Sequence, residues 1–322
     1  MNPPNWRFIQ RTNYTRLPLL CDFLKLSPEQ RSLLLDQPHF VLNLPRRLAE
    51  KIEKGTLNDP ILRQFIPFQK ETDSTTLFHH NPVGDLEARR APKLLHKYYG
   101  RALLLASSAC AMHCRYCFRQ EFPYEIEDRS FSRELDILTA DSSISEIILS
   151  GGDPLSLSNE TLSMLFTSLA NIPHIKRIRF HTRFPIGIPE RIDASLLNLF
   201  ASQPQQIFFI LHCNHARELD SEVLSSLHKV QQLGIPLLNQ SVLLKEVNDD
   251  EETLLTLCST LVNGGILPYY LHLLDRVSGS AHFEVPFERA QKLITYLQEH
   301  LSGYGIPRLV REEAGKKSKT WY

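Results

Sequence analysis

Three of the six cysteines in this chain of 322 residues stand within eight positions, in the stretch CAMHCRYC. Cys110 and Cys114 are separated by three residues, and Cys114 and Cys117 by two. Cysteines at this overall frequency would meet that spacing by chance in about two of a thousand such chains. Chance therefore explains this cluster of cysteines poorly. Clustered thiols serve as metal ligands, disulfides or redox groups.

A disulfide framework and a structural zinc site both match this stretch poorly. Disulfide frameworks belong to small chains dense in cysteine, whereas Cys21, Cys213 and Cys258 stand alone here and are expected to be buried. A structural zinc site needs four ligands, usually as two pairs, and there is no second pair. Three thiolates suit an iron–sulfur cube that keeps one iron without a protein ligand. An open metal position is where chemistry takes place.

Composition excludes several partners. Thirty-six basic residues balance thirty-six acidic ones, so the chain has no electrostatic footprint for nucleic acid or an anionic membrane. Hydrophobic residues make up 42%, enough for a sizeable core. The first residues, MNPPNWRFIQRTNY, contain no apolar signal region, and no apolar run approaches the length of a membrane span. We expect a cytoplasmic protein with neither nucleic-acid nor membrane partners.

The elements that must position the thiols begin near residue 100. Apolar runs follow one another mostly about thirty residues apart, the size of one βαβ unit. The runs cover 101–106, 145–150, 176–182, 205–212, 234–241 and 266–275, and helices are expected near 131–140, 158–170, 190–202, 217–233, 249–263 and 286–301. Strands alternating with helices predict a parallel sheet with right-handed crossovers.

Polar residues follow these runs: the cysteine loop, then SGGDPL, HTR, HCNH, NQS and Asp275. Active sites of parallel α/β folds gather at the carboxyl ends of the strands, and in a barrel those ends converge. We therefore predict an α/β fold and, of the two possible architectures, a partial (β/α)6 TIM-like barrel rather than an open doubly wound sheet. The expected divisions are an N-terminal, mostly helical extension at 1–95, the partial barrel at 96–301 and a C-terminal tail at 302–322.

The N-terminal extension shows weaker signals. SPEQRSLLLD (27–36) begins like a helix, because Ser is followed by Pro and Glu in the first turn. RRLAEKIEKG (46–55) is amphipathic, with Gly55 as the expected C-cap. Residues 58–92 lack periodicity and predict an irregular segment.

Several motifs resemble those of a known family. The Cys-x3-Cys-x2-Cys loop with Tyr116 before its last cysteine, followed by a Gly-Gly-acid turn after the next strand, is similar to the radical S-adenosylmethionine (radical SAM) superfamily. CRYCFR, SGGDPL, LHCNH, LLNQSVLL and YYLHLLD resemble the lysine 2,3-aminomutase family. The short chain and its ending EEAGKKSKTWY look most like the bacterial members that make β-lysine for modification of translation elongation factor P.

The resemblance implies a first pair of cofactors. Cys110, Cys114 and Cys117 would hold a [4Fe–4S] cluster whose free iron binds S-adenosyl-L-methionine, the source of a carbon radical. Gly151 and Gly152 would let the backbone approach the methionine moiety, and Tyr116 would lie near the adenine. Without the family resemblance, the sequence Gly151-Gly152-Asp153 would indicate an ordinary turn at the end of a strand.

The resemblance also implies pyridoxal 5'-phosphate, bound through a Schiff base to a lysine of the C-terminal tail. Lys319, directly before Thr320, is the matching position, with Lys316 and Lys317 as alternatives. The tail departs from the family pattern, because it has one glycine, extra lysines and no proline. Without the family, these lysines would be a solvated basic terminus.

Substrate contacts follow from the same likeness. Arg119 would bind the carboxylate of L-lysine, and Asp275 and Glu312 would pair with its ε-ammonium group. Arg101 would contact the phosphate of the second cofactor. The implied activity is an isomerase that converts L-α-lysine to β-lysine, reduced by a protein such as flavodoxin or ferredoxin and linked to a β-lysine ligase and elongation factor P. Two alternatives stay open: a radical SAM enzyme without pyridoxal phosphate, and a non-catalytic metal-binding module.

Overall fold

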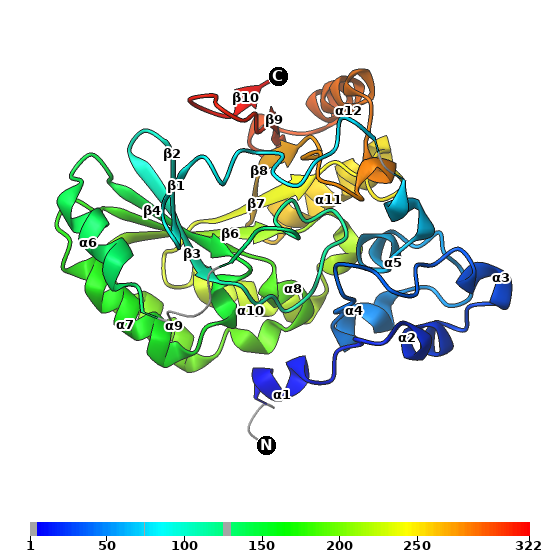
Figure 1. The fold of residues 1–322 in the computed structure, drawn as a ribbon, viewed down its shortest axis with the longest axis horizontal. Helices are drawn as coiled ribbons and strands as arrows, with labels where there is room; N and C mark the ends of the chain where they lie inside the picture. Colours follow the sequence, from blue (N-terminus) through cyan, green and yellow to red (C-terminus); the bar gives the residue numbers. More distant parts are fainter. Residues whose placement is uncertain (1–4, 74, 125–129) are drawn as a thin grey trace.

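The computed structural model describes residues 5–73, 75–124 and 130–322. Within them a ten-stranded sheet runs in sequence order from β1 to β10 (Figure 1). The strands are β1 (Arg89–Ala91), β2 (Leu94–Tyr98), β3 (Arg101–Ser107), β4 (Glu146–Gly151), β5 (Arg177–Thr182), β6 (Gln206–His212), β7 (Leu237–Val242), β8 (Leu267–His272), β9 (Arg308–Arg311) and β10 (Thr320–Trp321).

The strands β3 to β9 pair in parallel, and β1, β2 and β10 add antiparallel edges. The sheet order does not return from β10 to β1, so the sheet stays open. Each of the six predicted strands is present, and the predicted partial (β/α)6 barrel is confirmed. The helices that follow them are α6 (Ser132–Ala140), α7 (Asn159–Ala170), α9 (Ala194–Ser202), α10 (Ser221–Gln231), α11 (Glu251–Asn263) and α12 (Phe287–His300), with a short α8 (Phe184–Gly187) after β5.

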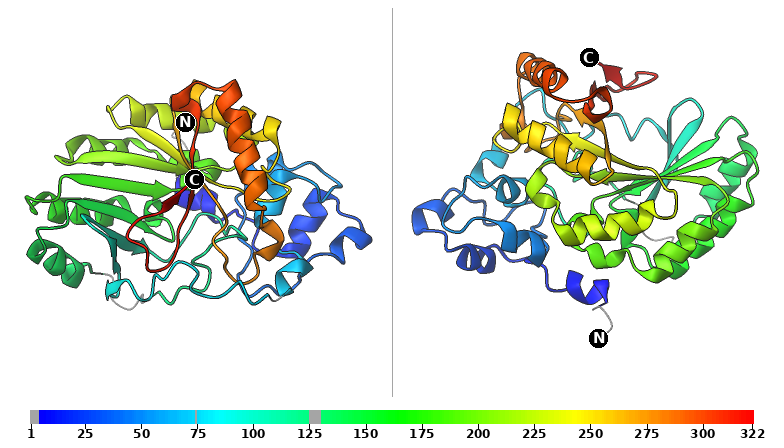
Figure 2. Two further views of the ribbon diagram at one scale, coloured as in Figure 1. Left: turned by 90° about the horizontal axis from the view of Figure 1, so that it is seen from above. Right: turned by 180° about the vertical axis from the view of Figure 1, so that it is seen from behind.

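Residues of the barrel strands alternate between two environments. In β5, Ile178, Phe180 and Thr182 are buried under the helices, whereas Arg177, Arg179 and His181 point to the opposite face. Side chains two residues apart share one face of a strand. The helices therefore cover one face of the sheet, and its concave face is free to line a cavity (Figure 2).

The N-terminal residues form short helices beside the barrel, coloured blue in Figure 1. They are α1 (Trp6–Gln10), α2 (Leu17–Leu24), α3 (Pro28–Arg31), α4 (Arg46–Lys51) and α5 (Pro60–Phe65). The helix start predicted at Ser27 is confirmed by a capping box with Gln30, although the helix is only one turn long.

Two expectations for this region are wrong. The helix expected to end on Gly55 ends at Lys51, and Gly55 lies in a later turn with a positive φ of 74°. The segment predicted to be irregular contains α5, whose first turn is capped by the carboxylate of Asp59 with Pro60 as its first residue. Tertiary burial of Ile61, Leu62 and Phe65 stabilises this short helix, which has too few residues to show a period.

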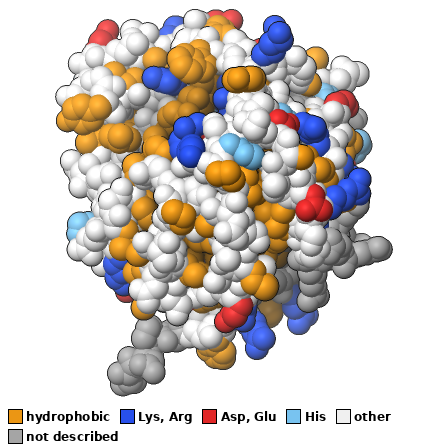
Figure 3. Space-filling model, turned by 90° about the vertical axis from the view of Figure 1, so that its left-hand side faces the viewer, with side chains coloured by type: hydrophobic (Ala, Val, Ile, Leu, Met, Phe, Trp, Pro, Cys, Tyr) orange, Lys and Arg blue, Asp and Glu red, His pale blue; other side chains and the backbone are white. Residues whose placement is uncertain are grey.

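The predicted boundaries at 95/96 and 301/302 stay predictions, although the sheet continues across both, through β2 and into β9. Among the described residues, no helix is long and apolar enough to cross a membrane. Basic, acidic and hydrophobic side chains are interspersed on the face drawn in Figure 3, in keeping with the balanced charge of the sequence.

Candidate active site

A cavity of about 1160 Å³ occupies the concave side of the sheet, larger than the usual site for one drug-sized ligand. It is lined by alternate residues of β3 to β8, by the cysteine loop and by the C-terminal tail. All eleven residues predicted for the site lie in its wall, from segments more than two hundred residues apart: Arg101, Cys110, Cys114, Tyr116, Cys117, Arg119, Gly151, Gly152, Asp275, Glu312 and Lys319.

The cysteine loop lies directly after β3, at its carboxyl end. Its three thiols are free and partly exposed to the cavity, whereas Cys21, Cys213 and Cys258 are buried as expected. In the described part of the chain, no three His, Cys, Asp or Glu side chains are close enough together to hold one metal ion. A four-iron cube is wider than one ion, so its thiolates do not have to converge on one point. Three thiols facing one cavity fit such a cluster.

Gly151 and Gly152 are required by backbone packing at the end of β4. Gly151 has φ +114°, and a Cβ added there would lie 2.6 Å from the carbonyl oxygen of Ser107. A Cβ on Gly152 would lie 2.4 Å from the carbonyl oxygen of Ala109. The two glycines therefore let β4 approach the start of the cysteine loop, whatever they contact in the cavity. Their predicted contact with the methionine moiety stays a prediction.

Asp153 completes the GGD turn by binding the next strand end. Its buried carboxylate accepts hydrogen bonds from Thr182 Oγ1 at 2.7 Å and from the backbone N–H groups of Arg183 and Phe184 at 2.8 and 3.1 Å. Burial raises the pKa of Asp153 to about 6, and these hydrogen bonds oppose the shift. The turn thus fixes the loop after β5 and the direction of Arg183.

Arg183 connects the cysteine loop to a buried polar network. Its Nη1 donates to Cys114 Sγ at 2.9 Å and to the hydroxyl of Tyr116, and its Nη2 donates to Glu218 Oε2 at 2.7 Å. Asn214 Nδ2 also donates to the Tyr116 hydroxyl, at 2.6 Å. The Tyr116 ring is therefore held in the cavity wall beside Cys114, where its predicted contact with adenine stays a prediction.

Five charged side chains alternate along the cavity. The Lys319 ammonium pairs with Glu312, and Lys97 bridges Glu312 and Asp85 at 2.8 and 2.5 Å. Asp85 accepts a hydrogen bond from Arg119 Nε at 2.7 Å. Burial alone would raise the pKa of Glu312, but Lys319 and Lys97 hold it well below its usual range. Burial would lower the pKa of Arg119, but Asp85 more than offsets this, so Arg119 stays cationic.

Asp275 lies at the end of β8 with a different environment. Its Oδ1 is buried and has no hydrogen-bond partner among the described residues, and the same holds for Nε2 of His181, His212 and His272 in the same wall. Burial raises the pKa of Asp275 to about 7, and the Glu312 carboxylate adds to the shift. A buried carboxylate oxygen with no partner among the described residues suits a cationic ligand group.

Arg101 begins β3 and stacks over the Tyr98 ring, with 4.7 Å between its guanidinium carbon and the ring centroid. The neighbouring Arg177 and Arg179 both pair with Glu146, whereas no carboxylate of the described residues pairs with Arg101. Its guanidinium is therefore available for an anionic ligand.

Several site residues were not predicted. Asp85 and Lys97 lie in a segment without a recognisable motif, and only the folded chain brings them beside Arg119 and Glu312. Arg183 follows the third apolar run within HTR, so its place at a strand end was a usable signal. His181 and His272 follow from alternation along β5 and β8, once it is known which face lines the cavity.

Comparisons with known proteins agree with this site. A protein-family model described as a 4Fe-4S single cluster domain matches residues 99–183, from the turn before β3 to Arg183. L-lysine 2,3-aminomutase of Escherichia coli (strain K12) is 43% identical over 87% of this chain and 83% of the relative. The chain belongs to the lysine 2,3-aminomutase family. The resemblance predicted from the motifs is thus confirmed, and the chain is an enzyme of the isomerase class.

Two further relatives show how far the lysine 2,3-aminomutase family likeness extends. L-lysine 2,3-aminomutase of Haemophilus influenzae is 39% identical over 99% of this chain and 95% of that protein. The protein of the same name from Clostridium subterminale is 30% identical over 98% of this chain and 77% of its own length. The likeness therefore covers a smaller share of the Clostridium protein than of the Haemophilus protein.

A solved structure of low sequence identity has a similar fold. Streptococcus suis SuiB bound to S-adenosylmethionine has a TM-score of 0.50 and 13% identity, covering 68% of this chain. This chain spans about half of SuiB, 52% of its length. At this identity the likeness shows a shared fold, and the 4Fe-4S match covers the part of that fold that carries the cysteine loop.

Proposed function

We propose that this chain is an L-lysine 2,3-aminomutase that moves the α-amino group of L-lysine to the β-carbon, using a [4Fe–4S] cluster, S-adenosyl-L-methionine and pyridoxal 5'-phosphate. One observation carries the proposal: the side chain of Lys319, three residues from the last residue of the chain, lines the same cavity as Cys110, Cys114 and Cys117. A radical source and a carbonyl-binding amine would act on one substrate only if they shared one cavity.

Lys319 is the tail lysine that fits the second cofactor. Its side chain is 19% exposed and is held by Glu312, whereas Lys316 and Lys317 are exposed and outside the cavity wall. Lys319 precedes Thr320 in β10, which pairs with Arg311 of β9. This pairing folds the tail back over the strands (Figure 2, left).

The cavity offers separate contacts for the parts of cofactor and substrate. When bound, the cluster and S-adenosylmethionine supply one-electron chemistry, and pyridoxal phosphate supplies the carbonyl carbon that holds the migrating amino group. Arg101 would bind the phosphate, because no carboxylate of the described residues competes for its guanidinium. Arg119 would bind the substrate carboxylate with its Nη atoms, since Asp85 takes only its Nε.

The substrate's ε-ammonium group would be bound at Asp275. Glu312 already pairs with two ammonium groups, of Lys97 and Lys319, whereas Asp275 Oδ1 has no partner in the described part of the chain. An ammonium group beside Asp275 would favour its ionised form and lower its raised pKa. Glu312 would hold Lys319 in place and contribute a second negative charge to the ammonium site.

The proposal also covers the use of the product and the source of the electron. The product would supply a ligase that attaches β-lysine to elongation factor P, as the residues EEAGKKSKTWY resemble those of members with that role. The cluster would take its electron from a reductant protein such as flavodoxin or ferredoxin in the cytoplasm. Tyr116, Gly151 and Gly152 would contact S-adenosylmethionine beside the free iron.

Borohydride trapping tests the two-cofactor site. The chain would be purified without oxygen, reconstituted with iron and sulfide, incubated with pyridoxal phosphate and reduced with borohydride before peptide mapping. We expect a brown protein with one pyridoxyl group on Lys319, and no adduct in Lys319→Ala. A brown protein without an adduct would favour a radical SAM enzyme lacking pyridoxal phosphate. A colourless zinc-containing protein would favour a non-catalytic metal-binding module.

A further inference from the structure

The cysteine loop takes most of its backbone partners from the N-terminal residues. Asn13 Nδ2 donates to the Ala111 carbonyl at 2.8 Å, and Gln10 Nε2 donates to the Cys110 carbonyl at 3.3 Å. The loop N–H of His113 donates to the Asn43 carbonyl at 2.9 Å. Because this loop has no regular secondary structure, such contacts replace the hydrogen bonds that a helix or strand would supply.

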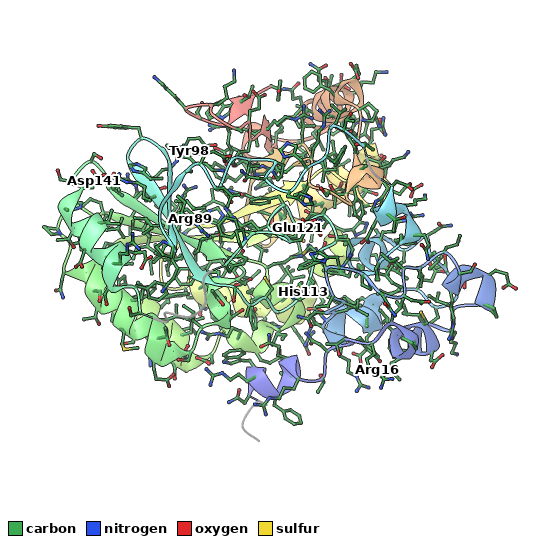
Figure 4. All side chains as sticks on the ribbon, viewed as in Figure 1. Arg16, Arg89, Tyr98, His113, Glu121 and Asp141 are labelled. Atoms are coloured by element: carbon green, nitrogen blue, oxygen red, sulfur yellow. The ribbon has the colours of Figure 1, made fainter. Side chains whose placement is uncertain are left out.

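His113 and Arg115, the residues on either side of Cys114, are held in the same way. The His113 ring stacks on Phe40 with 4.6 Å between ring centroids, and its Nδ1 lies 2.8 Å from the Val41 carbonyl oxygen. Figure 4 places His113 between the barrel and the N-terminal helices. The backbone N–H of Arg115 donates to the Gln64 carbonyl of α5 at 2.9 Å.

Arg115 and Glu71 form a buried ion pair at the centre of this contact. Arg115 is 2% exposed, and the side chain of Glu71 is 8% exposed. Arg115 Nε donates to Glu71 Oε1 at 2.9 Å, its Nη2 donates to the other carboxylate oxygen, and its Nη1 donates to the Phe40 carbonyl. A bidentate pair of this kind fixes orientation as well as distance. Arg115 stands directly after Cys114, so its orientation constrains the backbone that carries that thiol.

The same N-terminal residues reach the thiol side of the loop through Gln64. Gln64 Oε1 accepts from Arg183 Nη2 at 2.7 Å and from Asn214 Nδ2 at 3.0 Å, and Gln64 is fully buried. Arg183 in turn donates to Cys114 Sγ. The side chain that contacts the thiol is therefore oriented from both the barrel and α5.

We propose that residues 5–72 form an N-terminal clasp that holds the cysteine loop in the shape that binds the cluster, with Glu71 and Arg115 as its positioning residues. The inference rests on the cluster of the proposed function and assigns a role to a region whose motifs predicted none. Groups that orient metal ligands commonly change metal affinity when removed. The clasp would thus set how tightly the loop retains its cluster, while Glu71 and Arg115 themselves lie outside the cavity wall.

Replacing the carboxylate of the pair tests this directly. Glu71→Gln keeps the size of the side chain but removes its charge, and we expect the reconstituted protein to lose its cluster about ten-fold faster than wild type under a chelator or air. The readouts are iron per chain and the decay of visible absorbance. The matched control is Glu251→Gln, which breaks a bidentate pair with Arg289 between α11 and α12, outside the cavity wall. It should retain the cluster like wild type.

A second variant and a spectroscopic readout separate positioning from general stability. Asn13→Ala removes one loop contact at the surface of the clasp and should accelerate cluster loss less than Glu71→Gln. Both should change the electron paramagnetic resonance signal of the reduced cluster, while thermal unfolding of the metal-free chains identifies any variant that fails to fold. Cluster loss and spectra like wild type in folded Glu71→Gln and Asn13→Ala would overturn the clasp. If wild type itself bound no iron–sulfur cluster, the proposed function would fail instead.

Discussion

The N-terminal clasp and the C-terminal tail both lie outside the six βα units and both reach the cavity, but they are held there in different ways. The N-terminal clasp buries large apolar side chains, Trp6 at 8% exposure and Phe65 at 0% among them. The end of the C-terminal tail, residues 313–322, is held to β9 by β10, a two-residue strand, and by the ion pair of Lys319 with Glu312, while Trp321 is 58% exposed. The loop that would carry the cluster is thus fixed by packing, and the lysine that would carry pyridoxal phosphate lies on a segment of low local stability.

The difference matches the chemistry proposed for each segment. A cluster is a permanent ligand, so its loop gains from being rigid and shielded. A lysine that binds a cofactor and releases it to the substrate has to change partners during each turnover. An ion pair at the cavity wall can open without disturbing a core, whereas the clasp cannot move without exposing apolar surface.

The largest expected effect comes from removing the tail amine. Lys319→Ala should reduce β-lysine formation by at least about 10³-fold, because the residue acts on every turnover. Iron content should stay at the wild-type level, since the tail does not hold the cysteine loop. Lys316→Ala and Lys317→Ala are the matched controls and should keep nearly full activity by product assay. Loss of activity in either control with Lys319→Ala still active would assign the cofactor to another lysine.

The next largest expected effect is a difference in the unfolding free energy lost when a tryptophan is removed from the N-terminal clasp or from the C-terminal tail. Trp6 packs edge-on against Phe184 at 5.4 Å and lies under the guanidinium of Arg191, so Trp6→Ala should lower the free energy of unfolding by about 3–5 kcal/mol. Trp321 contacts Arg308 at the surface, so Trp321→Ala should cost about 0.5–1 kcal/mol. Urea unfolding of the metal-free chains measures both. Equal losses would show that the tail is packed as firmly as the clasp.

A smaller, pH-dependent effect is expected at Asp275, whose raised pKa of about 7 makes it a proton-bearing group near neutrality. An ammonium group binds its ionised form, so the KM for L-lysine should rise about ten-fold for each pH unit below 7. Asp275→Asn should raise KM and remove this dependence. A wild-type KM that is flat from pH 6 to 8 would contradict the assignment of the ε-ammonium group to Asp275.

The raised pKa of Asp275 also makes the stability of the folded chain depend on pH. The folded chain keeps a proton on Asp275 up to about pH 7, whereas its ordinary pKa is 3.8. Between these values the folded state binds more protons than the unfolded state, so the contribution of Asp275 to stability falls as pH rises through this window. In Asp275→Asn, this part of the pH dependence of unfolding should disappear.

The sequence predicted the barrel better than its surroundings. Each barrel strand is a short apolar run bounded by turn residues and followed by a helix, a pattern that repeats six times and fixes the topology. The strand β9 is four residues of a tail that looked basic, and β10 has only two, so neither shows a period. The helix α5 did have a signal, since Asp59 and Pro60 form a standard helix start.

Some residues of the site could be predicted from the sequence and others could not. The cysteines, Arg119 and Asp275 were found because they stand at the ends of predicted strands or in a recognised motif. Asp85, Lys97 and the pair of Glu71 with Arg115 could not be found, because their roles arise from contacts between residues 12 to 215 positions apart, such as Lys97 with Glu312 and Arg119 with Asp85. Charge complementarity across such separations is a property of the folded chain alone.

One measurement tests the central claim, that one cavity joins the cluster loop to the tail lysine for amino-group migration. The reconstituted protein would be given pyridoxal phosphate, S-adenosylmethionine, a reductant and L-lysine without oxygen, and β-lysine would be followed by mass spectrometry after derivatisation. We expect β-lysine from wild type and none above background from Cys114→Ala or Lys319→Ala. Cleavage of S-adenosylmethionine by wild type without any β-lysine would contradict it.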